Sequence, residues 1–158
     1  MRKKITAHRY HDFSTGHRVY QHESKCAHLH GHNYRIHFYC DSSHLDEVGR
    51  VIDFSDIKTC LCNWLEEEWD HKFLIYKNDP WAEPLKAMDK EGVVVVDFNP
   101  TAENMGLYLL NEIGPKQLKD SPVTLYKVVI EETRKCSAQI EEQFKHELMV
   151  RYKEDFPV

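Results

Sequence analysis

Three histidines near the start of the chain have the spacing of metal ligands. His30 and His32 lie two residues apart in the segment 26–34 (CAHLHGHNY), ahead of a strand-like run. Residues two apart on a strand point to one face, and Gly31 between them allows close backbone approach. His17, in the segment 13–18 (FSTGHR), supplies a third imidazole. Three imidazoles leave zinc one open position, as in catalytic zinc sites.

Cys26 lies in the same segment and leaves two interpretations open. As a fourth ligand it would close the site, and closed sites rich in thiolates are structural. Beside an open metal site, its thiolate would instead act as a base or a nucleophile. In both interpretations the same three histidines bind the metal.

Histidine is concentrated at one end of the chain, where the chemistry is therefore expected. Nine of the eleven histidines fall within the first 44 residues. Besides the three candidate ligands, the other six are predicted to be surface residues: His8, His11, His22, His28, His37 and His44.

The composition favours a cytoplasmic protein with a small-molecule or protein partner. Its 158 residues suit a single domain. Five cysteines, an odd number, and no apolar N-terminal segment indicate a reducing compartment rather than a disulfide framework. No apolar run approaches the roughly 18 residues of a membrane span. Because the net charge is −5, nucleic-acid binding is also disfavoured.

Hydrophobic periodicity predicts the elements that hold these residues. Segments 4–13 and 33–40 are expected to pair as an antiparallel hairpin, with 19–29 as a loop over the metal site. A helix is expected to begin at Ser55 and to end at 69–71 (WDH), which contains an acid–imidazole pair. The stripe on this helix places Cys60 in the core and Cys62 outside it.

The second half predicts two further helices and two strands. Thr101 caps the first helix, which carries Glu103 in its first turn and stops at Gly114-Pro115. Apolar residues at every fourth position predict a C-terminal helix over 140–158. A buried strand or an ordered loop is expected at 93–98, and a further strand at 125–131.

Five motifs follow one another along the chain. They are 13–18 (FSTGHR), 26–34 (CAHLHGHNY), 49–54 (GRVIDF), 70–72 (DHK), and 100–104 (PTAEN) followed by 132–133 (ET). Together they resemble the 6-pyruvoyltetrahydropterin synthase and 6-carboxytetrahydropterin synthase family from residue 13 to residue 133. The segments 76–92 and 140–158 lengthen the compact form of that family.

The resemblance implies a role for each candidate residue. It makes His17, His30 and His32 the zinc ligands, Cys26 the catalytic thiol, Asp70 and His71 a proton relay, and Glu132 the pterin anchor, with Thr101 and Glu103 beside it. A carboxylate matches the adjacent N–H and amino donors of a pterin by two parallel hydrogen bonds. Helix capping explains Thr101 and Glu103 equally well. Candidates for the triphosphate are Arg18, Lys25, Lys72 and Arg134.

The resemblance also implies an α+β tunnelling fold (T-fold). An antiparallel four-stranded sheet would carry helices on one face, and trimers would close a barrel that stacks into hexamers. Residues 1–158 would form one domain, with 140–158 as a helical extension. Family active sites lie between subunits, so Asp70 and His71 would serve a neighbour's Cys26.

Spacing favours one branch of this family. Only three residues separate Cys26 from His30, whereas a longer stretch is typical of the mammalian-type pyruvoyl enzyme. The resemblance therefore implies a 6-carboxytetrahydropterin synthase, a carbon–carbon lyase that converts 7,8-dihydroneopterin triphosphate to acetaldehyde, triphosphate and a carboxypterin for queuosine synthesis. Two alternatives remain: a pyruvoyltetrahydropterin synthase, and a non-catalytic zinc module with Cys26 as fourth ligand.

Overall fold

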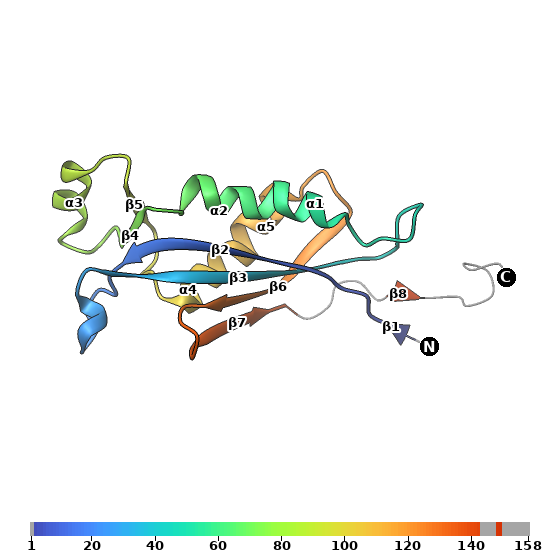
Figure 1. Ribbon diagram of the computed structural model, residues 1–158, viewed down its shortest axis with the longest axis horizontal. Coiled ribbons are helices and arrows are strands. Elements are labelled where there is room, and N and C mark those ends of the chain that lie inside the picture. The colour runs from blue at the N-terminus through green and yellow to red at the C-terminus, as the bar shows by residue number, and fades with distance from the viewer. Residues whose placement is uncertain (1, 143–147, 150–158) are drawn as a thin grey trace.

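A six-stranded mixed sheet organises the molecule. The computed structural model describes residues 2–142 and 148–149 (Figure 1). The sheet order is β5-β4-β2-β3-β6-β7, and a separate pair joins β1 to β8. The strands are β1 (Arg2–Lys3), β2 (Ala7–His17), β3 (His30–Ser42), β4 (Phe73–Tyr76), β5 (Val93–Val96), β6 (Val123–Glu131), β7 (Ser137–Glu141) and β8 (Leu148–Met149).

The predicted hairpin is confirmed and is longer than expected. β2 pairs antiparallel with β3 from Ala7 opposite Cys40 to His17 opposite His30. β3, β6 and β7 continue the antiparallel order. These four strands match the expected antiparallel sheet, but β4 and β5 add two parallel strands beyond β2. The α+β class is therefore correct, while the count of four strands was too low.

The helices of the described residues lie in two long helical segments and one shorter helix. They are α1 (Phe54–Ile57), α2 (Asn63–Glu68), α3 (Ala82–Met88), α4 (Ala102–Tyr108) and α5 (Gly114–Gln117). π-helical turns at Lys58–Cys62 and Leu109–Ile113 join α1 to α2 and α4 to α5. Figure 1 shows these two long helical segments running beside the sheet, and α3 near β4 and β5.

One face of the sheet carries the core. Tyr34, Ile36, Phe38 and Cys40 alternate along β3 and are buried against residues of both long helical segments. The intervening residues of β3 face the other side and are only half-buried. Burial of a large apolar side chain contributes roughly 1.5–3 kcal/mol, so this alternation fixes which face the helices cover.

Three details of the helices differ from the predictions. The cap of α1 is Asp53, whose carboxylate accepts from the backbone N–H of Ser55. Cys62 is fully buried and Cys60 only partly so, because the wider π-helical turn changes which residues face the sheet. Gly114-Pro115 does not end its helix, since a π-helical turn precedes it and α5 continues to Gln117.

The predicted C-terminal helix is wrong wherever the structure describes that part of the chain. Ile140 lies in β7, where it pairs with Val128, and Leu148 lies in β8. The apolar residues of β7 alternate with exposed ones, so the local period is that of a strand. The rest of the extension, at 143–147 and 150–158, lies outside the described residues.

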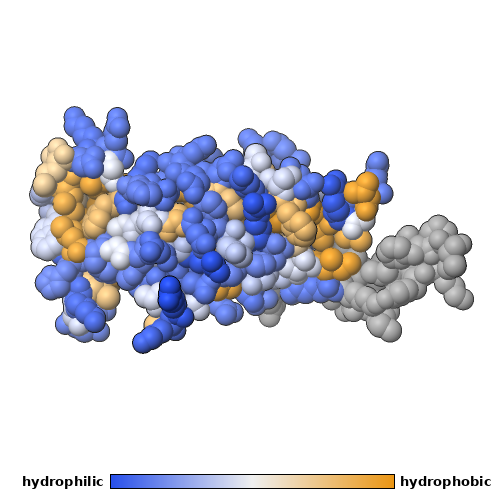
Figure 2. Space-filling view, viewed as in Figure 1, coloured by the Kyte–Doolittle hydropathy of each residue, from blue (hydrophilic) through white to orange (hydrophobic). Residues whose placement is uncertain are grey.

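The surface in view is mostly hydrophilic, with hydrophobic residues gathered toward its two ends (Figure 2). Val48 and Phe54 are exposed near one end of the sheet, and Met88 and Val95 near the other. Within residues 2–142 and 148–149, no helix has the length and apolarity that a membrane crossing requires.

Candidate metal and substrate site

The three candidate ligands meet at one end of the β2–β3 pair. His17 lies opposite His30, and His32 lies opposite Thr15. Each histidine offers a ring nitrogen, and the three nitrogens lie within 4.8 Å of one another. A Cβ on Gly31 would lie 3.0 Å from the carbonyl oxygen of Thr15, so this close strand approach favours glycine. Among the described residues, no other group of three His, Cys, Asp or Glu side chains is placed to hold a metal ion.

Backbone carbonyls orient two of the imidazoles. Nδ1 of His17 donates to the carbonyl of Pro100 at 2.6 Å, and Nδ1 of His30 donates to the carbonyl of His28 at 2.8 Å. These bonds leave Nε2 of each ring without a proton, which is the state that binds a metal. Nε2 of His30 and of His32 are buried without a hydrogen-bond partner. The donor set therefore fits a divalent metal ion.

Burial favours the neutral form of two of the three imidazoles, those of His17 and His32. It lowers the pKa of His17 to about 4, against the opposing hydrogen bond to Pro100 and with help from the neighbouring His30 and His32. Burial also lowers the pKa of His32, although the carboxylate of Glu132 acts in the opposite direction. Neutral imidazoles need to release no proton before they coordinate a metal.

A pocket of about 240 Å³ beside the histidines collects four of the predicted site residues: Cys26, Thr101, Glu103 and Glu132. Glu132 connects the pocket to the cluster, since its Oε1 lies 3.2 Å from Nε2 of His32, without the alignment of a hydrogen bond. Tyr34 lies close by, with its hydroxyl 3.3 Å from Nε2 of His17. Burial, then the charges of Glu132 and Cys26, raise the pKa of Tyr34, so this hydroxyl keeps its proton.

Thr101 and Glu103 have the structural role that the sequence also suggested. The hydroxyl of Thr101 accepts from the backbone N–H of Asn104 at 3.1 Å and caps α4. Glu103 lies in the first turn of this helix, where a negative charge is favourable. Both residues also line the pocket, so capping and ligand contact are compatible.

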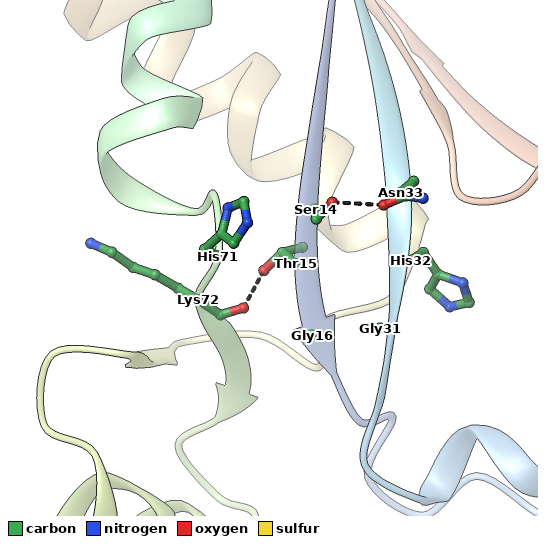
Figure 3. A pocket seen from close by; sticks show the side chains of 8 residues that line it. All are labelled: Ser14, Thr15, Gly16, Gly31, His32, Asn33, His71 and Lys72. Carbon is green, nitrogen blue, oxygen red and sulfur yellow. Dashed lines mark hydrogen bonds between the residues drawn. The ribbon is translucent and has the colours of Figure 1, made fainter.

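His71 lines a different cavity of the same chain from the pocket of Cys26 and Glu132. His71 lines a pocket of about 400 Å³ with Lys72 and with the candidate ligand His32, but Cys26 and Glu132 do not line it. Figure 3 shows His71 beside β2 and His32 on the far side of β3, so the two imidazoles do not face one another. Within one chain, the structure brings Cys26 and Glu132 together and leaves His71 apart.

The acid–imidazole pair is formed as expected. Nδ1 of His71 lies 2.7 Å from Oδ2 of Asp70, and the other carboxylate oxygen accepts from the backbone N–H of Ser14 at 3.0 Å. Burial would raise the pKa of Asp70, but these two hydrogen bonds outweigh it and lower that pKa. The side chain of His71 is 82% exposed. An ionised aspartate therefore orients an imidazole that faces outward.

Several neighbours of the site were not expected from the sequence. Tyr34 and the carbonyl of Pro100 contact His17, and His22 and Cys136 line the pocket of Cys26. Alternation along β3 could have predicted that Tyr34 lies near the site, because Tyr34 shares a face of the strand with His30 and His32. The other three come from separate loops, and their meeting depends on the tertiary fold.

The surface assignment of the remaining histidines is only partly right. His8, His28 and His44 are exposed. His11, His22 and His37 are half-buried, and two of them bind carboxylates: His11 binds Glu66 at 2.5 Å and His37 binds Glu131 at 2.6 Å.

The fold and the site together define an α+β protein with a three-histidine cluster that could hold a metal ion. The model of the 6-pyruvoyl tetrahydropterin synthase family matches residues 6–143. The 6-carboxy-5,6,7,8-tetrahydropterin synthase of Rickettsia bellii is 32% identical over 130 residues, which are 82% of this chain and 94% of that protein. The chain belongs to the 6-pyruvoyl tetrahydropterin synthase family.

Solved structures support the fold. An uncharacterized protein from Wolinella succinogenes, WS1659, has a TM-score of 0.77 at 24% identity and covers 89% of this chain and 99% of its own. The 6-pyruvoyl tetrahydropterin synthase of Caenorhabditis elegans has a TM-score of 0.60 at 26% identity, with 90% and 99% covered. The chain is thus similar to proteins of both named activities.

Proposed function

We propose that the chain is a zinc-dependent 6-carboxy-5,6,7,8-tetrahydropterin synthase. It would convert 7,8-dihydroneopterin triphosphate to 6-carboxytetrahydropterin, acetaldehyde and triphosphate, in a cytoplasmic pathway to queuosine. The observation that carries the proposal is the shared pocket: Cys26 and Glu132 line it together, and Glu132 lies 3.2 Å from the candidate ligand His32. The names of the curated relatives support the choice of reaction.

Each side chain then has a defined task. Glu132 accepts the paired N–H donors of the pterin and sets the ring in the pocket. Cys26 moves a proton to or from the substrate side chain, and His71, oriented by Asp70, moves the other. His17, His30 and His32 would hold a zinc ion, which would supply Lewis acidity for the reaction of the substrate side chain. Tyr34 keeps its proton and remains a hydrogen-bond donor beside the ligands.

Two observations favour an open catalytic site over a closed zinc module. Cys26 is not among the groups within 4.8 Å that form the candidate metal cluster. A closed module would also leave Glu132, at the edge of the substrate pocket, without a purpose. A pyruvoyltetrahydropterin synthase is the second candidate, supported by the likeness to the Caenorhabditis elegans structure. It would release triphosphate without breaking the carbon chain.

Loss of one ligand tests the zinc assignment. We expect the native protein to bind about one zinc per chain and His30→Ala to lose most of it, because two imidazoles hold zinc poorly. Triphosphate release from 7,8-dihydroneopterin triphosphate should fall with the metal content. Elemental analysis and a triphosphate assay measure the two quantities.

His28→Ala is the matched control for His30→Ala. Its side chain is exposed and outside the cluster, and its carbonyl, which orients His30, remains. We expect native zinc content and native turnover in this variant. Full zinc occupancy in His30→Ala would refute the proposed ligand set.

The separation of the two pockets predicts that subunits share active sites. Cys26→Ala and His71→Ala chains should each be inactive alone. When the two are unfolded together and refolded, the mixed oligomers should recover about a quarter of native activity, since random assembly pairs an intact thiol with an intact imidazole at that frequency. A turnover assay on the mixture measures this recovery, with each variant refolded alone as control. Absence of recovery in mixed oligomers of native size would place both groups in one subunit's site.

A further inference from the structure

Arg18, the residue after the candidate ligand His17, is buried in a closed arrangement. It is 7% exposed, and its partner Asp79 is 3% exposed. Nε and Nη2 of Arg18 donate to the two carboxylate oxygens of Asp79, the second bond at 3.0 Å. The ring of Trp81 covers the guanidinium, with its centroid 3.5 Å from Cζ. We call Arg18, Asp79 and Trp81 the Arg18 clamp.

The clamp also holds the backbone beside the candidate catalytic thiol. Nη1 of Arg18 donates to the carbonyl of Ala27 at 2.9 Å. The next residue, Val19, donates its backbone N–H to the carbonyl of Cys26 at 2.9 Å. Two consecutive carbonyls of the short 3-10 turn Lys25–Ala27 are therefore fixed from the end of β2.

Backbone hydrogen bonds also hold Asp79 of the clamp within the segment that follows β4. Oδ1 of Asp79 accepts from the backbone N–H of Trp81 at 2.9 Å. The carbonyl of Asp79 accepts from Ala82 at 2.9 Å, at the start of α3. The 76–92 segment, which lengthens this chain, thus supplies two of the three clamp residues.

The Arg18 clamp contributes more to the position of the guanidinium than to the stability of the fold. A buried ion pair loses about as much by desolvation as it gains, and apolar replacements of both partners are often neutral or stabilising. A bidentate guanidinium, however, fixes direction as well as distance. Because Arg18 is covered by Asp79 and Trp81, it is also not available for an incoming triphosphate.

We propose that Arg18 is a positioning residue for Cys26. Held by Asp79 and Trp81, it fixes the turn that carries the thiol at the edge of the pocket of Glu132. The consequence for turnover rests on the proposed function, whereas the consequence for the position of the thiol does not. Misplacement of a catalytic group by about 1 Å can lower a rate about 100-fold.

A double substitution separates positioning from stability. Arg18→Met with Asp79→Leu removes both buried charges together, so the fold should be kept, but it also removes the donor to Ala27. We expect kcat to fall about 10- to 100-fold with KM changed less than about threefold. Zinc content and Tm should stay near native values.

The reactivity of the thiol gives a readout that needs no substrate. Intact zinc-loaded protein is treated briefly with iodoacetamide, and mass spectrometry of peptides gives the alkylation rate of Cys26 relative to Cys136, which lines the same pocket. In the double variant, which lacks the clamp, we expect the alkylation rate of Cys26 relative to Cys136 to rise several-fold. Asp12→Asn, which breaks the exposed bidentate pair of Arg35 and Asp12, should leave the ratio unchanged.

The alkylation ratio decides the outcome. A native ratio in a folded double variant would overturn the proposal. If the double variant does not fold, Trp81→Ala decides in the same way, because Trp81 is 42% exposed and its loss uncovers the guanidinium without emptying the core. Native protein that does not turn over the pterin would refute the proposed function. The alkylation ratio would still test the positioning role of Arg18, because it does not depend on turnover.

Discussion

Cys26→Ala is expected to abolish conversion of 7,8-dihydroneopterin triphosphate while the protein stays folded and keeps its zinc. Three imidazoles already hold the metal in this account, and Cys26 lies outside their cluster. Loss of a group that transfers protons lowers a rate by about 10²- to 10⁴-fold. Turnover, elemental analysis and thermal unfolding of the same sample measure the three expectations.

The same variant separates the catalytic and structural interpretations of the thiol. If Cys26 were a fourth ligand, its loss would remove metal and lower the Tm, because metal binding contributes to folding free energy. Cys136→Ala is the matched control, since this thiol lines the same pocket. We expect near-native turnover in the control. A Cys26→Ala protein without zinc and with a lowered Tm would contradict the lyase mechanism.

Glu132→Ala is expected to lower kcat/KM by about 10²- to 10⁴-fold with zinc retained, because two charge-assisted hydrogen bonds at roughly 1.5–3 kcal/mol each are lost. Much of the loss should appear as a raised KM, since the interaction sets the pterin ring in the ground state as well. β6 ends at Glu131, so the strand should still form. Steady-state kinetics over a wide substrate range measures both constants.

Glu131→Ala is the control for Glu132→Ala. Its carboxylate binds His37 at 2.6 Å on the sheet face that the helices leave uncovered, and it does not line the pocket of Cys26. Native KM in this neighbour would assign the effect to one carboxylate rather than to the strand end. Native kinetics in Glu132→Ala would leave the pterin without its proposed anchor.

The sequence predicts that the three histidines meet because the signal is local. Strand alternation places His30 and His32 on one face, and the antiparallel register then brings His17 opposite His30. The residues Cys26 and Glu132 were found through their motifs, and the fold brings both to the same pocket. Short-range patterns therefore account for most of the candidate site.

Strand alternation, helical periodicity and motif spacing do not predict contacts between distant segments. Arg18 and Asp79 are 61 residues apart, and neither lies in a periodic run that would predict their pairing. The apolar run 93–98 did indicate a strand where β5 lies, but β4 and β5 have only four residues each, too few for alternation to predict their parallel pairing. The exchange of Cys60 for Cys62 in the core depends on a π-helical turn, which side-chain periodicity does not reveal.

Product identification tests the central claim most directly. Purified zinc-loaded protein is incubated with 7,8-dihydroneopterin triphosphate, and the pterin product is identified by mass while acetaldehyde is assayed separately. From the proposed lyase activity we expect 6-carboxytetrahydropterin and acetaldehyde in equal amounts, together with triphosphate. A pterin product that keeps all carbon atoms of its side chain, with triphosphate released and no acetaldehyde, would contradict it and identify the pyruvoyl reaction instead.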